Sequence, residues 1–99
     1  MENQLTLVVP IKVKSEFRGE VRNLLLELAR QTRKEAGNIH YIVHEVADHK
    51  NEFLIYEVWK NQEALAFHMQ QPYLIKFLEE ESKFLRETIS SIFCKVIEA

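Results

Sequence analysis

The chain has 99 residues, of which 46% are hydrophobic and 28% are charged, and its formal net charge at pH 7 is −2. This composition is typical of one folded domain, so we expect a single domain over residues 1–99 and exclude a disordered or membrane-spanning chain. The 13 basic and 15 acidic side chains are mixed along the sequence, which argues against nucleic acid as a partner.

Cys94 is the only cysteine, which excludes an internal disulfide and a paired-cysteine zinc or redox motif. It lies in an apolar, β-branched run, where we expect a small buried thiol. No apolar segment reaches the roughly twenty residues that cross a bilayer, and the first residues lack a signal-peptide pattern. We therefore expect no membrane association and a reducing, cytoplasmic location.

The first predicted element is a strand over residues 5–13, where apolar residues alternate with a period of two. Pro10 cannot donate to a strand ladder, so an edge or a bulge is expected near the middle of this strand. The period then lengthens to three or four residues, which predicts one long amphipathic helix over residues 17–36. Ser15 is expected to cap its start, and Gly37 to end it in a left-handed conformation.

Residues 39–46 and 53–59 are rich in β-branched and aromatic side chains and are separated by a turn-like cluster, which predicts a β-hairpin. Asn61 is expected to cap a short helix that Pro72 interrupts. A further helix follows with its own apolar stripe. Residues 89–97 then return to a pattern typical of a strand.

The order strand, helix, strand, strand, helices, strand matches the split β-α-β arrangement of ferredoxin-like folds. We therefore predict an α+β domain in which an antiparallel sheet carries helices on one face. Apolar residues occur on both sides of the strands predicted over 53–59 and 89–97, so the other face of the sheet also needs cover. A two-fold homodimer with its sheets packed face to face, a dimeric α/β barrel, would provide that cover.

Several segments resemble one known family: residues 35–41 (EAGNIHY), 56–59 (YEVW) and 64–73 (ALAFHMQQPY). They are similar to the antibiotic biosynthesis monooxygenase family, whose pattern is roughly E-x-G-(N/C)-x-x-Y, then Y-E-x-W, then A-x-x-x-H-x-x-(T/S)-P-(H/Y). The resemblance spans essentially the whole chain. It implies a ferredoxin-like fold and a range of activities, which include oxidation of quinols or anthrones without a cofactor, haem degradation, and isomerisation of a phosphorylated sugar.

The glycines limit the cofactors that the chain can bind. Only Gly19 and Gly37 are present, so there is no glycine-rich phosphate cradle and no dinucleotide fingerprint. The resemblance then implies a monooxygenase without bound flavin, haem or metal, whose small quinol or polyphenol substrate itself reduces dioxygen. Such a reaction needs a base, a donor that stabilises an anion, and an apolar wall.

The candidate catalytic residues are His68, Asn38 and Trp59. His68 falls on the family's histidine position and an imidazole titrates near neutral pH, which suits a base; alternatively, it braces the end of its helix beside Pro72. Asn38 offers an amide donor to an oxyanion, or it is an ordinary helix-exit residue. Trp59 can donate its indole N–H and stack on a planar ring, or it is simply a core residue.

The residues predicted to bind substrate are the aromatic side chains Tyr41, Tyr56, Tyr73 and Phe67. Tyr73 stands where many members of the family have a second histidine, a departure that removes any mechanism requiring two. Glu45 and Glu57 lie within strand patterns, and the sequence allows either to face the pocket or an arginine of a partner.

Haem and metal sites are not expected. Asn3 and Trp59 resemble residues of the haem-degrading branch, but the position of its iron-ligating histidine falls near Leu78, which cannot bind iron. His40 and His44 lie on a predicted strand, where four residues span about 13 Å, too far for both to bind one ion.

The sequence leaves two alternatives to a monooxygenase. One is an isomerase or other proton-transfer enzyme that uses His68 on a small oxygenated metabolite without oxygen. The other is a non-catalytic module that binds a ligand in the same pocket. Turnover without oxygen would favour the first, and a pocket filled by Trp59 and its neighbours would favour the second.

Overall fold

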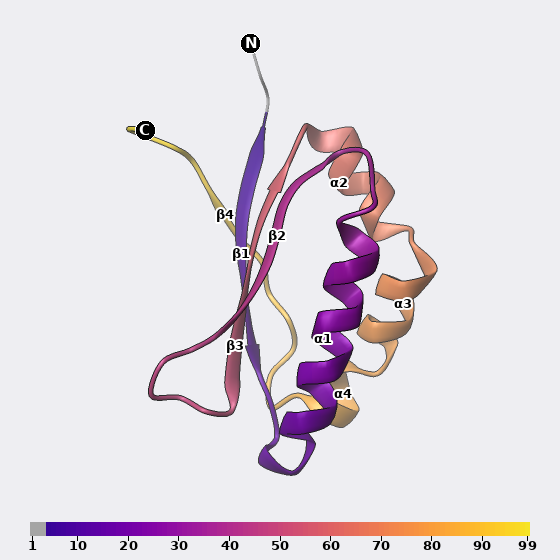
Figure 1. Ribbon diagram of the computed structural model, residues 1–99, viewed down its shortest axis with the longest axis vertical. Coiled ribbons are helices and arrows are strands. Elements are labelled where there is room, and N and C mark those ends of the chain that lie inside the picture. The colour runs from indigo at the N-terminus through magenta and orange to yellow at the C-terminus, as the bar shows by residue number, and fades with distance from the viewer. Residues whose placement is uncertain (1–3) are drawn as a thin grey trace.

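The computed structural model describes residues 4–99, so Asn3 lies outside the described residues. The strands are β1 (Leu5–Lys12), β2 (Asn38–Glu45), β3 (Glu52–Trp59) and β4 (Ile92–Cys94). The helices are α1 (Arg18–Thr32), α2 (Gln62–Met69), α3 (Pro72–Glu79) and α4 (Glu81–Phe84). The strands form one antiparallel sheet in the order β2-β3-β1-β4, and the helices cover one of its faces (Figure 1). The predicted α+β, ferredoxin-like fold is therefore confirmed.

β1 lies inside the sheet but has one edge that is only partly paired. It pairs with β3 along its whole length without a register shift, whereas β4 pairs only with Thr6–Val8. Pro10 lies beyond that short ladder, where β4 no longer pairs with β1. The prediction of an edge near Pro10 is thus confirmed, and this edge tolerates a residue that has no N–H to donate.

The segment between α1 and β2 departs from the prediction. α1 ends at Thr32, and the φ of Gly37 is not positive, so the predicted left-handed helix stop is wrong. A Cβ on Gly37 would lie 2.3 Å from the Cβ of Ala64 in α2, so glycine is needed because the backbone passes close to that helix. Ser15 also does not cap α1: it begins a short 3-10 turn that precedes the helix, whose N-cap residue is Phe17.

The local signals after the hairpin are mostly confirmed. The Asn61 side chain accepts a hydrogen bond from the backbone N–H of Ala64 at 2.9 Å and caps α2, and α3 begins at Pro72. The predicted last strand is shorter than expected, because β4 covers only Ile92–Cys94 at the edge of the sheet. Cys94 is exposed there, so the prediction of a buried thiol is wrong for the single chain.

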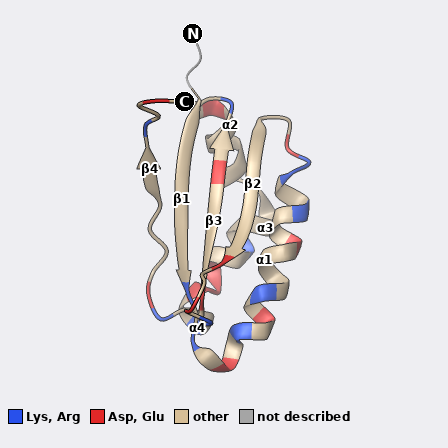
Figure 2. Cartoon of the chain, turned by 60° about the vertical axis from the view of Figure 1, so that its left-hand side comes forward, with Lys and Arg blue, Asp and Glu red and all other residues tan. Residues whose placement is uncertain are grey.

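The face of the sheet that carries no helices is largely apolar. Directly paired residues form a row across all four strands, which we call the open-face row: Ile42, Tyr56, Val8 and Ile92. Ile42 and Ile92 are exposed. Charged residues gather along α1 and around the turns, while the strands carry few of them (Figure 2). No helix within residues 4–99 is long and apolar enough to cross a membrane.

Candidate functional site

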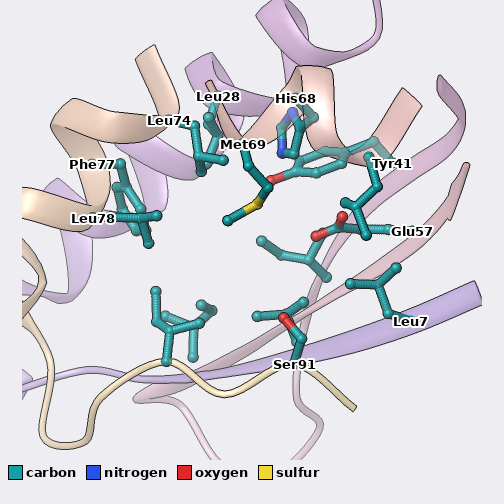
Figure 3. Close-up of a pocket in the computed structure, with 15 residues that line it drawn as sticks. Leu7, Leu28, Tyr41, Glu57, His68, Met69, Leu74, Phe77, Leu78 and Ser91 are labelled. Carbon is teal, nitrogen blue, oxygen red and sulfur yellow. The ribbon is translucent and has the colours of Figure 1, made fainter. Parts of the chain in front are cut away.

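A cavity of about 80 Å³ lies between the helix-covered face of the sheet and the helices (Figure 3). Most of its wall is aliphatic or aromatic and comes from β1, β3, α2 and α3. Its polar side chains are Tyr41, Glu57, His68 and Ser91. An apolar cavity with a few converging polar groups is the usual form of a small-molecule site.

His68 lies in the last turn of α2 and is only 2% exposed. Its Nδ1 is 2.8 Å from Oε2 of Glu35, so the neutral ring donates Nδ1–H to this carboxylate and keeps a lone pair on Nε2. The ring also packs against Trp59, with 4.6 Å between centroids, and against the edge of Tyr41 at 5.8 Å. Because Nδ1 is engaged, Nε2 is the nitrogen left for a ligand.

The electrostatic surroundings keep His68 in the form that a base requires. Burial lowers the pKa of the imidazole, and the hydrogen bond and charge of Glu35 act in the opposite direction without reversing the shift. A lowered histidine pKa means that the ring is neutral at neutral pH. His68 can therefore accept a proton there, and Glu35 would stabilise the cation that forms.

Glu35 joins three separate parts of the chain. It lies between α1 and β2, and its Oε2 accepts hydrogen bonds from His68 of α2 and from the hydroxyl of Tyr73 of α3. Burial and the neighbouring carboxylate raise the pKa of Tyr73, so its hydroxyl remains a donor. Glu35 thus fixes the orientation of the imidazole and ties α2 to α3 at the same point.

Glu57 lies near the C-terminal end of β3, paired with Tyr41 on β2 and with Leu7 on β1, and is 5% exposed. Its Oε1 accepts the indole N–H of Trp59 at 2.9 Å. Burial raises the pKa of this carboxyl to about 7, even though the bond from Trp59 acts in the opposite direction. Near neutral pH both protonation states of Glu57 are therefore populated.

Four of the residues predicted for the site lie together. His68 and Tyr41 line the cavity, where Figure 3 shows the Tyr41 ring between His68 and Glu57. Trp59 is fully buried beside the imidazole, and Tyr73 reaches His68 indirectly through their shared carboxylate. Trp59 is not part of the cavity wall, so it does not fill the pocket.

The other three predicted residues lie away from the cavity. The Asn38 amide donates to the backbone oxygen of His40 at 3.0 Å, at an irregularity in the pairing of β2 with β3. Tyr56 lies on the open face, its ring 6.0 Å from that of His40. Phe67 is 55% exposed on the outer side of α2. Within one chain, none of these three lines the cavity.

Two acidic residues of the site were missed as catalytic candidates, although the sequence carries a signal for each. Glu57 has the same parity along β3 as the buried Phe53 and Ile55, which predicts a side chain that faces the core. Glu35 begins the first motif of the family resemblance. The orientation of Glu45, which the sequence left open, is also clear: Glu45 bonds to arginines at the surface of its own chain.

Comparison with known proteins agrees with this architecture. Residues 5–80 match the family "Antibiotic biosynthesis monooxygenase". An uncharacterized protein of Synechocystis sp. is 34% identical over 88 residues, which are 89% of this chain but 60% of that protein, so the chain spans only about 60% of its length. The Bacillus subtilis protein named "Putative monooxygenase YcnE" is 31% identical over 81 residues, 82% of this chain and 85% of that one.

Solved structures show the same fold at lower sequence identity. A Pseudomonas aeruginosa protein superimposes with a TM-score of 0.91 at 21% identity, covering 99% of this chain and 98% of its own. The likeness therefore extends to the whole described chain, including β4.

Proposed function

This chain belongs to the antibiotic biosynthesis monooxygenase family, and we propose that it is a cofactor-independent monooxygenase that acts on a small quinol or polyphenol. The observation that carries the proposal is the buried pair of His68 and Glu35 at the wall of an apolar cavity. A neutral imidazole held by a carboxylate is suited to remove a phenolic proton, and an apolar wall keeps water from the resulting anion.

The proposed reaction is balanced without an external reductant. Nε2 of His68 takes the proton of a phenolic hydroxyl, and the phenolate passes electrons to dioxygen. One oxygen atom then enters a ring C–H bond, while the other leaves as water with the two hydroxyl hydrogens. Hydroquinone and dioxygen thus give hydroxybenzoquinone and water, and all the electrons that reduce dioxygen come from the quinol.

The size of the cavity indicates which side chain admits a substrate. Its volume of about 80 Å³ is below the roughly 150 Å³ of an apolar cavity that holds benzene. Met69 lines the cavity and is 50% exposed, and its unbranched side chain can adopt other rotamers at little cost. We propose that Met69 swings outward when an aromatic ring enters.

The function is tested with purified protein, hydroquinone and dioxygen labelled with ¹⁸O. We expect catalysed oxygen uptake and one labelled oxygen atom in each molecule of hydroxybenzoquinone, because the mechanism transfers a single atom from dioxygen. Uptake no faster than in buffer, with hydroquinone and with catechol, would refute the proposal.

A proton-transfer isomerase is the second candidate, because His68 and Glu57, two groups able to exchange protons, line one cavity. Conversion of a substrate under argon at the aerobic rate would favour it over a monooxygenase. A ligand that binds but is not converted under either gas would favour the non-catalytic module.

We also propose that the protein is a homodimer in which two sheets pack through the open-face row. The row joins all four strands, and a partner sheet would remove its exposed isoleucines from water. Sedimentation velocity at low micromolar concentration should give twice the mass of the chain. Val8→Lys, which places a charge in the row, should give monomers, whereas Leu26→Lys on the exposed side of α1 should not. A monomeric wild type would contradict the proposal.

A further inference from the structure

Glu57 is a buried carboxyl group that the reaction described above leaves unused. Within residues 4–99 no lysine, arginine or histidine forms an ion pair with it, and Trp59 is the donor to one of its two oxygens. Its neighbours in the sheet are Leu7 and Tyr41. Burying a carboxylate with so few partners costs several kcal/mol, whereas an aliphatic residue at this position would stabilise the core.

The carboxyl is oriented as well as buried. The bond from the Trp59 indole engages Oε1, and Trp59, the last residue of β3, packs against the ring of His68. Glu57 also lines the cavity, on the sheet side, while His68 lines it from the helix side (Figure 3). Oε2 of Glu57 and Nε2 of His68 are therefore the carboxylate and imidazole acceptors left for a ligand; the other polar groups of the wall are the hydroxyls of Tyr41 and Ser91.

We propose that Glu57 is the substrate-binding group of the cavity, that its Oε2 accepts a hydrogen bond from one hydroxyl of a dihydroxybenzene, and that the second hydroxyl meets His68. This inference rests on the proposed function for the class of substrate and deepens it: two acceptors select a ring with two hydroxyl donors. A ring that carries a carboxylate is excluded, because it would bring a second negative charge beside Glu57 without a cation to offset it.

The groups that face Glu57 are consistent with this role. Tyr41 lies beside it on β2, Glu35 acts on it from the segment after α1, and His68 lies on α2. None of them is a permanent cation, so in the ionised form of Glu57 no neighbouring positive charge competes with a ligand for the carboxylate.

The test uses three rings of similar shape under argon, so that binding is measured without turnover. Hydroquinone carries two hydroxyls, 4-fluorophenol carries one, and 1,4-difluorobenzene carries none. Titration calorimetry on the wild type should give the tightest binding for hydroquinone, with each lost hydroxyl weakening the affinity about tenfold or more, as expected for hydrogen bonds to polar or charged acceptors.

The decisive variant is Glu57→Gln. The glutamine carbonyl can still accept the Trp59 N–H, but its NH₂ group then faces the ligand as a donor. We expect hydroquinone to bind this variant about as weakly as 4-fluorophenol binds the wild type, with 1,4-difluorobenzene unchanged. Glu45→Gln, at a surface carboxylate, is the matched control and should bind all three rings like the wild type.

Two results would overturn the inference: an unchanged hydroquinone affinity in Glu57→Gln, or an equal weakening of hydroquinone and 1,4-difluorobenzene, which would indicate a structural role only. Failure of hydroquinone to bind the wild type would overturn it as well. The outcome is separable from that of the proposed function, because selective binding under argon without oxygen uptake in air would refute the monooxygenase and leave the binding role of Glu57 intact.

Discussion

Replacing His68 by glutamine should lower the kcat for hydroquinone by about 100-fold to 10,000-fold, the range that general-base catalysis typically contributes. The glutamine amide can still donate to Glu35, so the buried carboxylate keeps a partner, but an amide cannot accept the phenolic proton. Oxygen uptake followed with an electrode measures the effect. His49→Gln changes an exposed histidine in the turn between β2 and β3 and should keep the wild-type rate.

The pH profile identifies the base independently. Burial lowers the pKa of His68 below its ordinary value of 6.5, so the wild-type kcat, measured at saturating hydroquinone to remove the effect of Glu57 on binding, should fall only as the pH drops below that value and the imidazole becomes protonated. This fall at acid pH, the acid limb of the profile, should be missing from whatever activity His68→Gln retains. A variant with the full rate and the same acid limb would contradict a base role for His68.

Glu57→Gln should make the protein more stable at pH 8, by on the order of 3 kcal/mol, and equally stable near pH 4.5. The native fold raises the pKa of Glu57 from 4.5 to about 7, and each unit corresponds to about 1.4 kcal/mol. An acid whose pKa is raised by folding binds its proton more tightly in the native state, so its contribution is favourable below pH 4.5 and is lost as the pH rises through 7. Glutamine does not ionise, so the variant does not lose this stability as the pH rises.

Urea unfolding at pH 8 and at pH 4.5 measures this difference in the free energy of unfolding. Titration of His68 affects wild type and Glu57→Gln equally, so it cancels in the comparison. Glu45→Gln serves as the control, because its carboxylate is exposed and should give no comparable gain at pH 8. An identical free energy of unfolding for wild type and Glu57→Gln at pH 8 would show that the buried carboxylate carries no cost. A gain would fit the common pattern in which a functional site is kept at the expense of stability.

Part of the site follows from the sequence, because some positions are determined by local chemistry. Asn61 was predicted to cap α2, and this cap fixes the helix whose last turn carries His68. The alternation along β3 also predicts that Glu57 faces the core, because every second residue of a strand lies on the same side and Phe53, Ile55 and Glu57 are spaced in this way. Strand periodicity and helix capping depend on neighbours within a few residues, so they can be recognised without knowing the fold.

The order of the elements, the hairpin, the helix-covered sheet and the family motifs were determined by the sequence itself. Only the tertiary structure decided that Glu35 meets His68, 33 residues further along the chain, and Tyr73, 38 residues further. It also decided that Gly37 is needed for its distance from Ala64 rather than for its φ. These contacts depend on how α2 and α3 pack over the sheet, and local propensity carries no information about distances between segments that are remote in sequence.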